Sequence, residues 1–476
     1  MRIIFVFFFS LTLLHAQTYE EFIRAQNEAF SSYKEERDKE FSDYLNKEWK
    51  AFQESMGVKA YEKKKPSILP QAKRLVSQKP VKKILVLKQP TTKKVDKRYT
   101  KIIIQPDSEK LKTLFLSFFG VDITLHYDKS MMISIERGLS KEKISDAWDS
   151  LAKSEYETTL DELTSIFKKL HLNDWAKYLL IKQTANAIYK NENEARIFTW
   201  FTLLKMGYDA HLSFQNHRVI LLIPIDGELY NTVYYTLNNK QYYAIDYYAK
   251  GKLGPTMTYE NIYEGSNSGL DFSIKTLPLL VENKTVKRLA FDVDNVHQSV
   301  TLEYDKNLFD FYQSYPQVDY SSYFSAPESV LLDESIKKAF EPLILGKSQS
   351  EALDIILGFV QHAFKYKVDT EQFDKEKVMF PSETIFYTYS DCEDRAILFS
   401  YMVKVLFGMD VLGLKYPNHM ATAVGINEKL DGEYVLYRDR PYIVADPTYV
   451  NAKIGLSMPQ YRGKKSYEIV ATGGEK

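Results

Sequence analysis

The chain of 476 residues contains a single cysteine, Cys392. An internal disulfide therefore cannot form, and paired cysteines for a zinc or redox site are excluded. Lysine plus arginine equals aspartate plus glutamate at 63 each, so no net charge attracts a nucleic acid. The sequence also lacks a phosphate-binding glycine loop and a His-Glu-x-x-His motif. We expect no cofactor, no metal ion and no nucleic-acid partner.

Long apolar runs are absent except at the start of the chain. In residues 1–16, a positive Arg2 precedes an apolar stretch, and polar sequence returns from His15. This is the form of a signal peptide, and the run is shorter than the roughly 20 residues that span a bilayer. The sequence predicts an exported protein, periplasmic or secreted. An uncleaved anchor is the alternative interpretation.

What the chain does contain is a globular composition, with 45% hydrophobic and 14% aromatic residues. Its length exceeds what one core usually supports, so several domains are expected. We predict a multidomain α+β fold. Its parts are an N-terminal long helix in residues 17–55, a basic linker in 56–100, a folded domain in 101–262, a β-rich central region in 263–333 and a C-terminal domain in 334–476.

Residues 17–55 carry an aromatic repeat with a period of eleven, as in Phe30, Phe41 and Phe52. Eleven residues complete three helical turns, so the aromatics form one stripe on an amphipathic helix, as in a coiled coil. Such a stripe needs a partner surface. The partner is either a second copy of the chain, which means self-association, or the protein's own body.

Residues 56–100 are rich in lysine and contain spaced prolines. Proline at this density disfavours helix and favours an extended linker. The positive charge could tether the protein to an anionic cell-envelope surface. A merely soluble linker is the other interpretation.

Cys392 begins an apolar helix within the sequence Ser390-Asp391-Cys392-Glu393. We expect a capping box between Ser390 and Glu393, which puts Cys392 in the first helical turn. The helix dipole and the unpaired amides there favour a thiolate and can stabilise an oxyanion. For an isolated cysteine, an inert packing role is the alternative.

His419 precedes one strand-like segment, and Asp446 ends another just before Pro447. Along the chain, His419 lies as far from Cys392 as from Asp446. A helix followed by two strands lets the three side chains converge. The roles follow from their chemistry: Cys392 attacks, His419 takes its proton, and Asp446 orients the imidazole.

At these residues the chain resembles the transglutaminase-like superfamily, whose fold is related to papain. The matching features are Ser390-Asp-Cys-Glu-Asp394, His419 before a small-residue strand, Ala445-Asp-Pro-Thr-Tyr449, and the upstream helix of residues 357–366. The resemblance covers roughly residues 351–458. It implies a papain-like C-terminal domain that acts through its thiol on amide bonds of a protein or peptide substrate. Ser390 departs from the family pattern, in which glycine is common two residues before the cysteine.

Residues 101–262 contain a degenerate copy of the same pattern. Asn191, His217 and Asp246 align there with the three candidate residues. Because asparagine cannot act as a thiolate does, we expect this copy to be inactive and to serve as scaffold or substrate surface. Chance similarity of two helix-strand-strand units is the alternative.

Two classes of function remain. The first is an exported cysteine hydrolase, either a peptidase or an amidase, with an acyltransferase as its close variant. The second is a non-catalytic envelope scaffold or binding protein built on the same domains. The presence of all three side chains favours the enzyme, whereas the inactive copy, the basic linker and the striped helix fit assembly.

Overall fold

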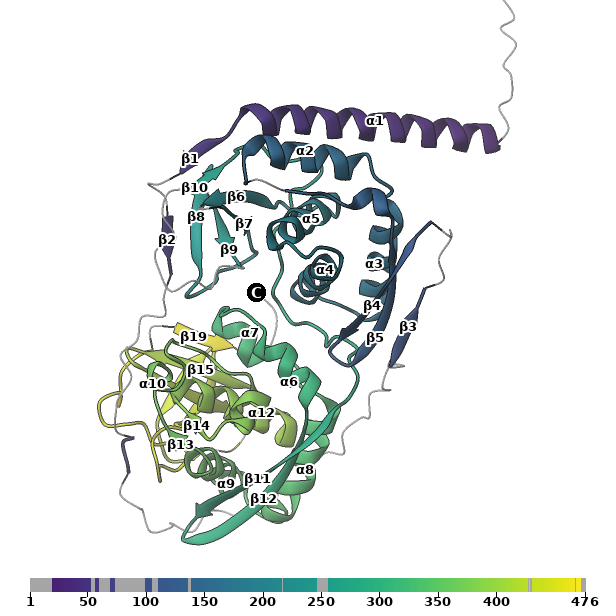
Figure 1. Cartoon of the computed structure of the whole chain (residues 1–476). Helices are drawn as coiled ribbons and strands as arrows, with labels where there is room; N and C mark the ends of the chain where they lie inside the picture. Colours follow the sequence, from purple (N-terminus) through teal and green to yellow (C-terminus); the bar gives the residue numbers. More distant parts are fainter. Residues whose placement is uncertain are drawn as a thin grey trace, which may run out of the picture.

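The computed structural model arranges the chain as two lobes, one above the other in Figure 1. The residues described are 19–52, 56–59, 69–72, 99–104, 110–135, 138–215, 217–245, 256–426, 428, 430–466 and 468–471. Helices and sheets occur together in both lobes, so the predicted α+β class is confirmed. The expected signal peptide lies outside the described residues. Within them, no helix combines the length and the apolar character that crossing a bilayer requires.

Helix α1 (Tyr19–Lys47) runs along the outside of the upper lobe (Figure 1). The sequence predicted a helix through residues 17–55, and this is wrong at the C-terminal end. There, β1 (Lys50–Phe52) pairs with β10 (Thr256–Thr258). The aromatic repeat continues into β1, but backbone pairing with a distant strand decides the local structure.

The C-terminal half of α1 packs on the protein's own body. Phe41 is buried against Trp148, with ring centroids 4.8 Å apart, whereas Phe30 in the same stripe is 68% exposed. Asp38 forms a buried ion pair with Lys205. Burial lowers the pKa of Lys205 to about 8, although the charge of Asp38 opposes this. One of the two predicted partners of the stripe, the body of the protein, is therefore in place.

We predict that Phe41→Leu lowers the free energy of unfolding by about 1–2 kcal/mol, because a smaller side chain leaves part of a buried site unfilled. Phe30→Leu changes an exposed position of the same repeat and should alter it by less than about 0.5 kcal/mol. Urea denaturation followed by tryptophan fluorescence measures both. Equal effects would contradict the packing of α1 on the upper lobe.

The upper lobe continues with a three-stranded sheet, in the order β3-β5-β4, and a group of helices. These elements are β3 (Lys101–Ile103), β4 (Lys112–Phe118), β5 (Val121–Tyr127), the 3-10 helix η1 (Lys129–Met131), α2 (Lys141–Ala152), α3 (Glu157–Lys169) and α4 (Asp174–Ile188). The short strands and the helical periodicity that the sequence indicated are found here. Strand β4 was not foreseen.

A seven-stranded sheet completes the upper lobe, in the order β1-β10-β6-β7-β9-β8-β2. Its further elements are α5 (Glu192–Lys205), β6 (His211–Gln215), β7 (Arg218–Ile223), β8 (Val233–Leu237), β9 (Lys240–Ala244) and β2 (Met56–Val58). The start of the predicted basic linker is thus a strand, because β2 pairs with β8. Gln71 of the same segment forms a bridge with Val450. Most of the other linker residues lie outside the described ranges.

The predicted β-rich central region contains one hairpin instead. Strands β11 (Lys284–Val293) and β12 (Val296–Asp305) show the alternation that the sequence indicated, and they pair along their full length. The chain then forms helices α6 (Lys306–Gln313) and α7 (Tyr320–Ser325), where strands were expected. Asp305 starts α6 by accepting the backbone N–H of Asn307.

The lower lobe is helical first and then strand-rich, as predicted. Its elements are α8 (Val330–Ile344), α9 (Gln349–His362), β13 (Lys365–Tyr366), α10 (Asp369–Phe373), α11 (Pro381–Phe386), β14 (Tyr389–Ser390), α12 (Cys392–Phe407), β15 (Val411–Tyr416), β16 (His419–Gly425), β17 (Tyr434–Tyr437), β18 (Arg440–Ala445) and β19 (Glu468–Ala471). Helix α12 packs against β15 and against β16, the strand that His419 begins.

The two lobes share one topology. In the upper lobe, α5 and the next five strands give the spatial order β10-β6-β7-β9-β8. In the lower lobe, α12 and the next five strands give the order β19-β15-β16-β18-β17. Each strand has the same place in both sheets, and all these pairs are antiparallel. One helix-and-sheet unit therefore occurs twice along the chain.

Candidate active site

Helix α12 begins one residue later than the predicted capping box requires. Asp391 precedes the helix, and its backbone N–H donates to Asp394 Oδ2 at 3.1 Å. Ser390 lies in β14, where its hydroxyl accepts from Arg395 Nε at 3.0 Å. The expected box between Ser390 and Glu393 is therefore wrong, because both side chains have other hydrogen-bond partners.

Cys392 is the first residue of α12, and its side chain is fully buried. The thiol donates to Glu393 Oε2, with the two atoms 2.8 Å apart. The other carboxylate oxygen of Glu393 accepts from the hydroxyl of Tyr320 at 3.1 Å. Sulfur can donate to a carboxylate only while it carries its proton. This contact directs the sulfur of Cys392 toward Glu393.

His419 and Asp446 are brought together by two neighbouring strands. His419 begins β16 and Asp446 follows β18, and these strands are antiparallel, so the start of one lies beside the end of the other. His419 Nε2 and Asp446 Oδ2 are 2.8 Å apart, and both side chains are buried. Asp446 Oδ1 accepts the backbone N–H groups of Thr448 and Tyr449 at 3.0 and 3.2 Å. The carboxylate is thereby fixed toward the imidazole.

The second nitrogen of the imidazole is available for proton transfer. His419 Nδ1 is buried and has no hydrogen-bond partner within the described part of the chain. A hydrogen bond from Cys392 to His419 is therefore not formed in this conformation. The imidazole stacks on the ring of Tyr461, with centroids 5.0 Å apart and planes inclined by 14°. Met420, next to His419, belongs to the same buried cluster as Cys392.

Three surrounding residues were not identified from the sequence. From the sequence, Glu393 was expected to cap helix α12. Tyr320 and Tyr461 lie outside the short motifs around Cys392, His419 and Asp446. The position of Glu393 directly after the cysteine was the one available signal, since a neighbouring carboxylate can contact the thiol. Tyr320 lies 73 residues before Glu393, so only the folded chain relates them.

Three buried carboxylates near the site are close enough to share a cation. The side-chain oxygens of Asp369, Asp391 and Asp394 lie within 4.8 Å of one another. Backbone N–H groups already donate to two of them, from Lys377 to Asp369 and from Met379 to Asp394. These bonds tie the loop before α11 to α10 and to the start of α12. Hydrogen bonding within the fold therefore accounts for Asp369 and Asp394.

The upper lobe has a different set of residues at the equivalent positions. The β6–β7 turn pairs Gln215 with Arg218, as the β15–β16 turn pairs Tyr416 with His419. Arg218 therefore corresponds to His419. The sequence alignment of His217 with His419 is wrong by one residue, because His217 is exposed in the turn with φ at +64°.

Asn191, which the sequence alignment places at the nucleophile position, has a structural role in the upper lobe. Asn191 precedes α5, and its side chain accepts the backbone N–H groups of Asn193 and Glu194 at 2.8 and 3.4 Å. It therefore caps the helix. Asp246 lies outside the described residues.

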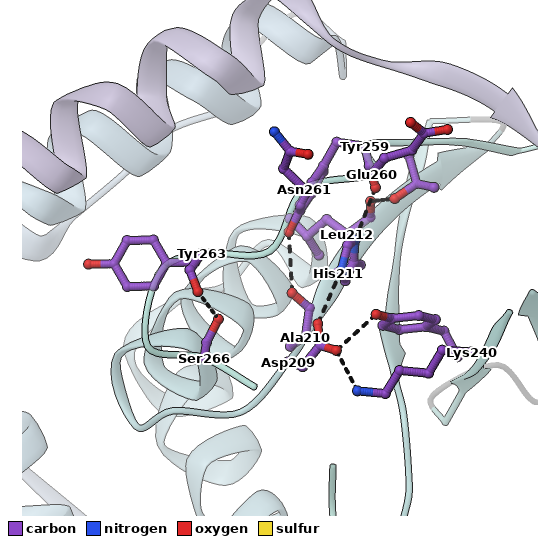
Figure 2. A network of polar contacts seen from close by, with 12 residues as sticks. Asp209, Ala210, His211, Leu212, Lys240, Tyr259, Glu260, Asn261, Tyr263 and Ser266 are labelled. Carbon is purple, nitrogen blue, oxygen red and sulfur yellow. Dashed lines mark hydrogen bonds and ion pairs between the residues drawn. The ribbon is translucent and has the colours of Figure 1, made fainter. Parts of the chain in front are cut away.

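A second buried histidine–aspartate pair occurs in the upper lobe (Figure 2). Asp209 accepts from Lys240 Nζ at 2.7 Å and from the Tyr242 hydroxyl at 2.8 Å, and its other oxygen lies 3.2 Å from His211 Nε2. Burial raises the pKa of Asp209, but the neighbouring His211 and Lys240 outweigh it, so the pKa is lowered. His211 Nδ1 faces the carbonyl oxygen of Tyr259 at 3.1 Å. With the only cysteine in the other lobe, this network joins strands and offers no thiol chemistry.

Comparison of the chain with protein-family models, with curated proteins and with solved structures finds no match. The function is therefore argued from the geometry of the site itself. That geometry consists of a histidine–aspartate pair, a cysteine at a helix N-terminus, and a carboxylate that accepts from the thiol.

Proposed function

We propose that the lower lobe is a transglutaminase-like cysteine enzyme that acts on amide bonds of proteins or peptides. The observation that carries this proposal is the buried His419–Asp446 pair, 2.8 Å apart, whose remaining imidazole nitrogen has no hydrogen-bond partner among the described residues. A carboxylate that holds one nitrogen fixes the ring and leaves the other nitrogen to accept a proton. The chain's only cysteine begins the helix that packs on the same strand.

The chemistry that these groups support is acyl transfer through a thioester. The Cys392 proton passes to His419 Nδ1, and the sulfur forms a bond to the amide carbon. The backbone N–H groups at the start of α12 stabilise the oxyanion. His419 then gives its proton to the leaving nitrogen as the carbon–nitrogen bond breaks. Water or an amine then attacks the thioester, its proton passes to His419, and the carbon–sulfur bond breaks to release the sulfur. Hydrolysis and transamidation therefore share this intermediate.

We further propose that the protein works outside the cytoplasm, periplasmic or secreted. The apolar residues near the N-terminus support export, and the lysine-rich segment 56–100 supports contact with an anionic envelope surface. The exposed half of α1, including Phe30, is available for self-association. A non-catalytic envelope scaffold is the second candidate function. The complete burial of Cys392 favours it, because a buried thiol can serve packing alone.

The reactivity of Cys392 distinguishes the two candidates. We predict that His419→Gln slows alkylation of Cys392 by iodoacetamide about tenfold at pH 7, because the imidazole no longer takes the thiol proton. The rate is measured in the folded protein from pH 5 to pH 9. Because the chain has one cysteine, incorporated label reports this site alone.

His297→Gln is the matched control, since His297 forms an exposed pair with Asp292, at 2.9 Å, on the β11–β12 hairpin. It should leave the rate unchanged. In the wild type and in both variants, the same opening motion has to expose the buried thiol before it is alkylated. The ratio of the alkylation rates therefore reports the effect of the imidazole on the thiol. Equal rates and equal pH profiles in wild type and His419→Gln would remove the catalytic proposal and leave the scaffold.

A further inference from the structure

We propose that helix α7 is a latch on Cys392, held through Tyr320 and Glu393, and that the site acts only when α7 is displaced. The latch is defined as α7 with its side chains Tyr320, Tyr323 and Phe324. This inference rests on the proposed function and concerns the regulation of the same thiol.

The first step is the chain of contacts from α7 to the sulfur. Tyr320 donates to one oxygen of Glu393, and Cys392 donates to the other, at 3.1 and 2.8 Å. All three side chains are buried. A carboxylate with a donor on each oxygen is held in one orientation. The thiol is thereby directed to Glu393, while the buried Nδ1 of His419 has no partner in the described part of the chain.

The second step is the packing of α7 over the site. Phe324 lies against Gly413 of β15, where a Cβ atom would come within 2.7 Å of the ring. Tyr323 packs on Phe380, with ring centroids 4.6 Å apart. Phe324 and Phe380 belong to the same buried cluster as Cys392. The short helix is therefore attached through side chains, and a shift of α7 would take Tyr320 away from Glu393.

The third step is the connection of α7 to the upper lobe. Helix α7 lies between the two lobes (Figure 1). In the segment leading into it, Asp319 accepts from the Tyr230 hydroxyl at 3.1 Å, and the Gln317 carbonyl accepts the backbone N–H of Tyr230 at 2.8 Å. Tyr230 belongs to the upper lobe, so movement between the lobes pulls on the latch. The inactive lobe thereby controls access to the thiol of the other.

Displacement of α7 has two consequences for the chemistry. Solvent and substrate reach the first turn of α12, and Glu393 loses the donor that fixes it. The thiol is then able to turn from Glu393 toward His419 Nδ1, which is the acceptor that the acyl-transfer mechanism needs. Tyr320 is accordingly a positioning residue that acts through Glu393.

The test is the alkylation rate of Cys392 in the full chain. Tyr320→Phe keeps the aromatic ring and removes the hydroxyl, so we expect alkylation about tenfold faster than in the wild type. Tyr323→Phe is the matched control on the same helix, because its hydroxyl faces the backbone N–H of Val318 at 3.4 Å. It should change the rate less than about twofold. Tyr230→Phe should also accelerate alkylation, by a smaller factor than Tyr320→Phe.

Urea denaturation of each variant separates opening of the latch from loss of global stability. Acceleration by Tyr320→Phe, at a global stability equal to that of Tyr323→Phe, supports the latch. Equal alkylation rates in Tyr320→Phe, Tyr323→Phe and the wild type overturn it. Comparison of Tyr320→Phe with His419→Gln keeps the two proposals apart. If Tyr320→Phe accelerates alkylation but His419→Gln has no effect, the latch stands and the proposed function fails; the reverse result removes the latch alone.

Discussion

Arg395→Met is expected to lower the free energy of unfolding by about 3–5 kcal/mol. The guanidinium is fully buried, and burial lowers the pKa of Arg395 to about 10. Its nitrogens donate to Ser390 Oγ at 3.0 Å and to the carbonyl oxygens of Gln361 and Phe364 at 3.3 and 2.8 Å. The Gln361 carbonyl lies in the last turn of α9 and the Phe364 carbonyl lies just beyond it. The last carbonyl groups of a helix have no backbone N–H donor within the helix, so they need donors from elsewhere. Methionine fills the volume but leaves three buried acceptors without this donor, at roughly 1–3 kcal/mol each before relaxation.

The matched control is Arg440→Met, because the Arg440 side chain is 63% exposed and lies 3.5 Å from Asp410. It should change the free energy of unfolding by less than about 0.5 kcal/mol. Arg395→Lys keeps the charge but has no planar fork to serve three separate acceptors, so most of the loss should remain. Urea denaturation measures all three variants. Equal stability of Arg395→Met and Arg440→Met would mean that the buried guanidinium provides no net stabilisation.

The local sequence pattern predicted where helices and strands form better than it predicted which strands and helices contact one another. The alternation in β11 and β12 and the apolar periodicity of α12 were sufficient to locate these elements. The segment Lys50–Phe52 continues a helical repeat and is nevertheless a strand, because it pairs with β10 more than 200 residues later. The aromatic-rich residues of α6 and α7 were expected to form strands. Tertiary contacts override weak local propensity in both cases.

The candidate site was predictable where it depends on order along the chain. His419 and Asp446 meet because each stands at an end of adjacent antiparallel strands, which the motif order implies. The contacts of the thiol depend on Tyr320, from a helix that no motif indicated. The alignment of His217 failed for another reason: a one-residue difference in the turn decides which side chain begins the strand. Register and long-range packing are properties of the folded chain, and short motifs do not encode them.

The pH dependence of stability is expected to contain a large contribution from one buried carboxyl group, Glu328. Its Oε1 accepts the backbone N–H of Ser382 at 2.9 Å, and its Oε2 has no partner within the described residues. Burial raises the pKa of Glu328 from 4.5 to about 8, against the hydrogen bond from the Ser382 backbone N–H that lowers it. The nearby carboxylates of Asp333 and Glu383 act in the same direction as burial. Between these two pH values the folded state holds one more proton than the unfolded state, so the free energy of unfolding falls as pH rises, by up to about 1.4 kcal/mol per pH unit.

Glu328→Gln removes this titration while preserving the shape of the side chain. We expect the variant to match the wild type within about 1 kcal/mol near pH 5 and to exceed it by on the order of 3 kcal/mol at pH 8.5. Glu341→Gln, at an exposed position of helix α8, which begins two residues after Glu328, should show no such divergence. Burial also raises the pKa of Asp354 to about 6, but this group is present in every variant and cancels in the comparison. Urea denaturation at intervals of pH measures the difference. Parallel curves for Glu328→Gln and the wild type would mean that Glu328 is already ionised in the folded protein, so that its burial is compensated by charges or solvent near Ser382.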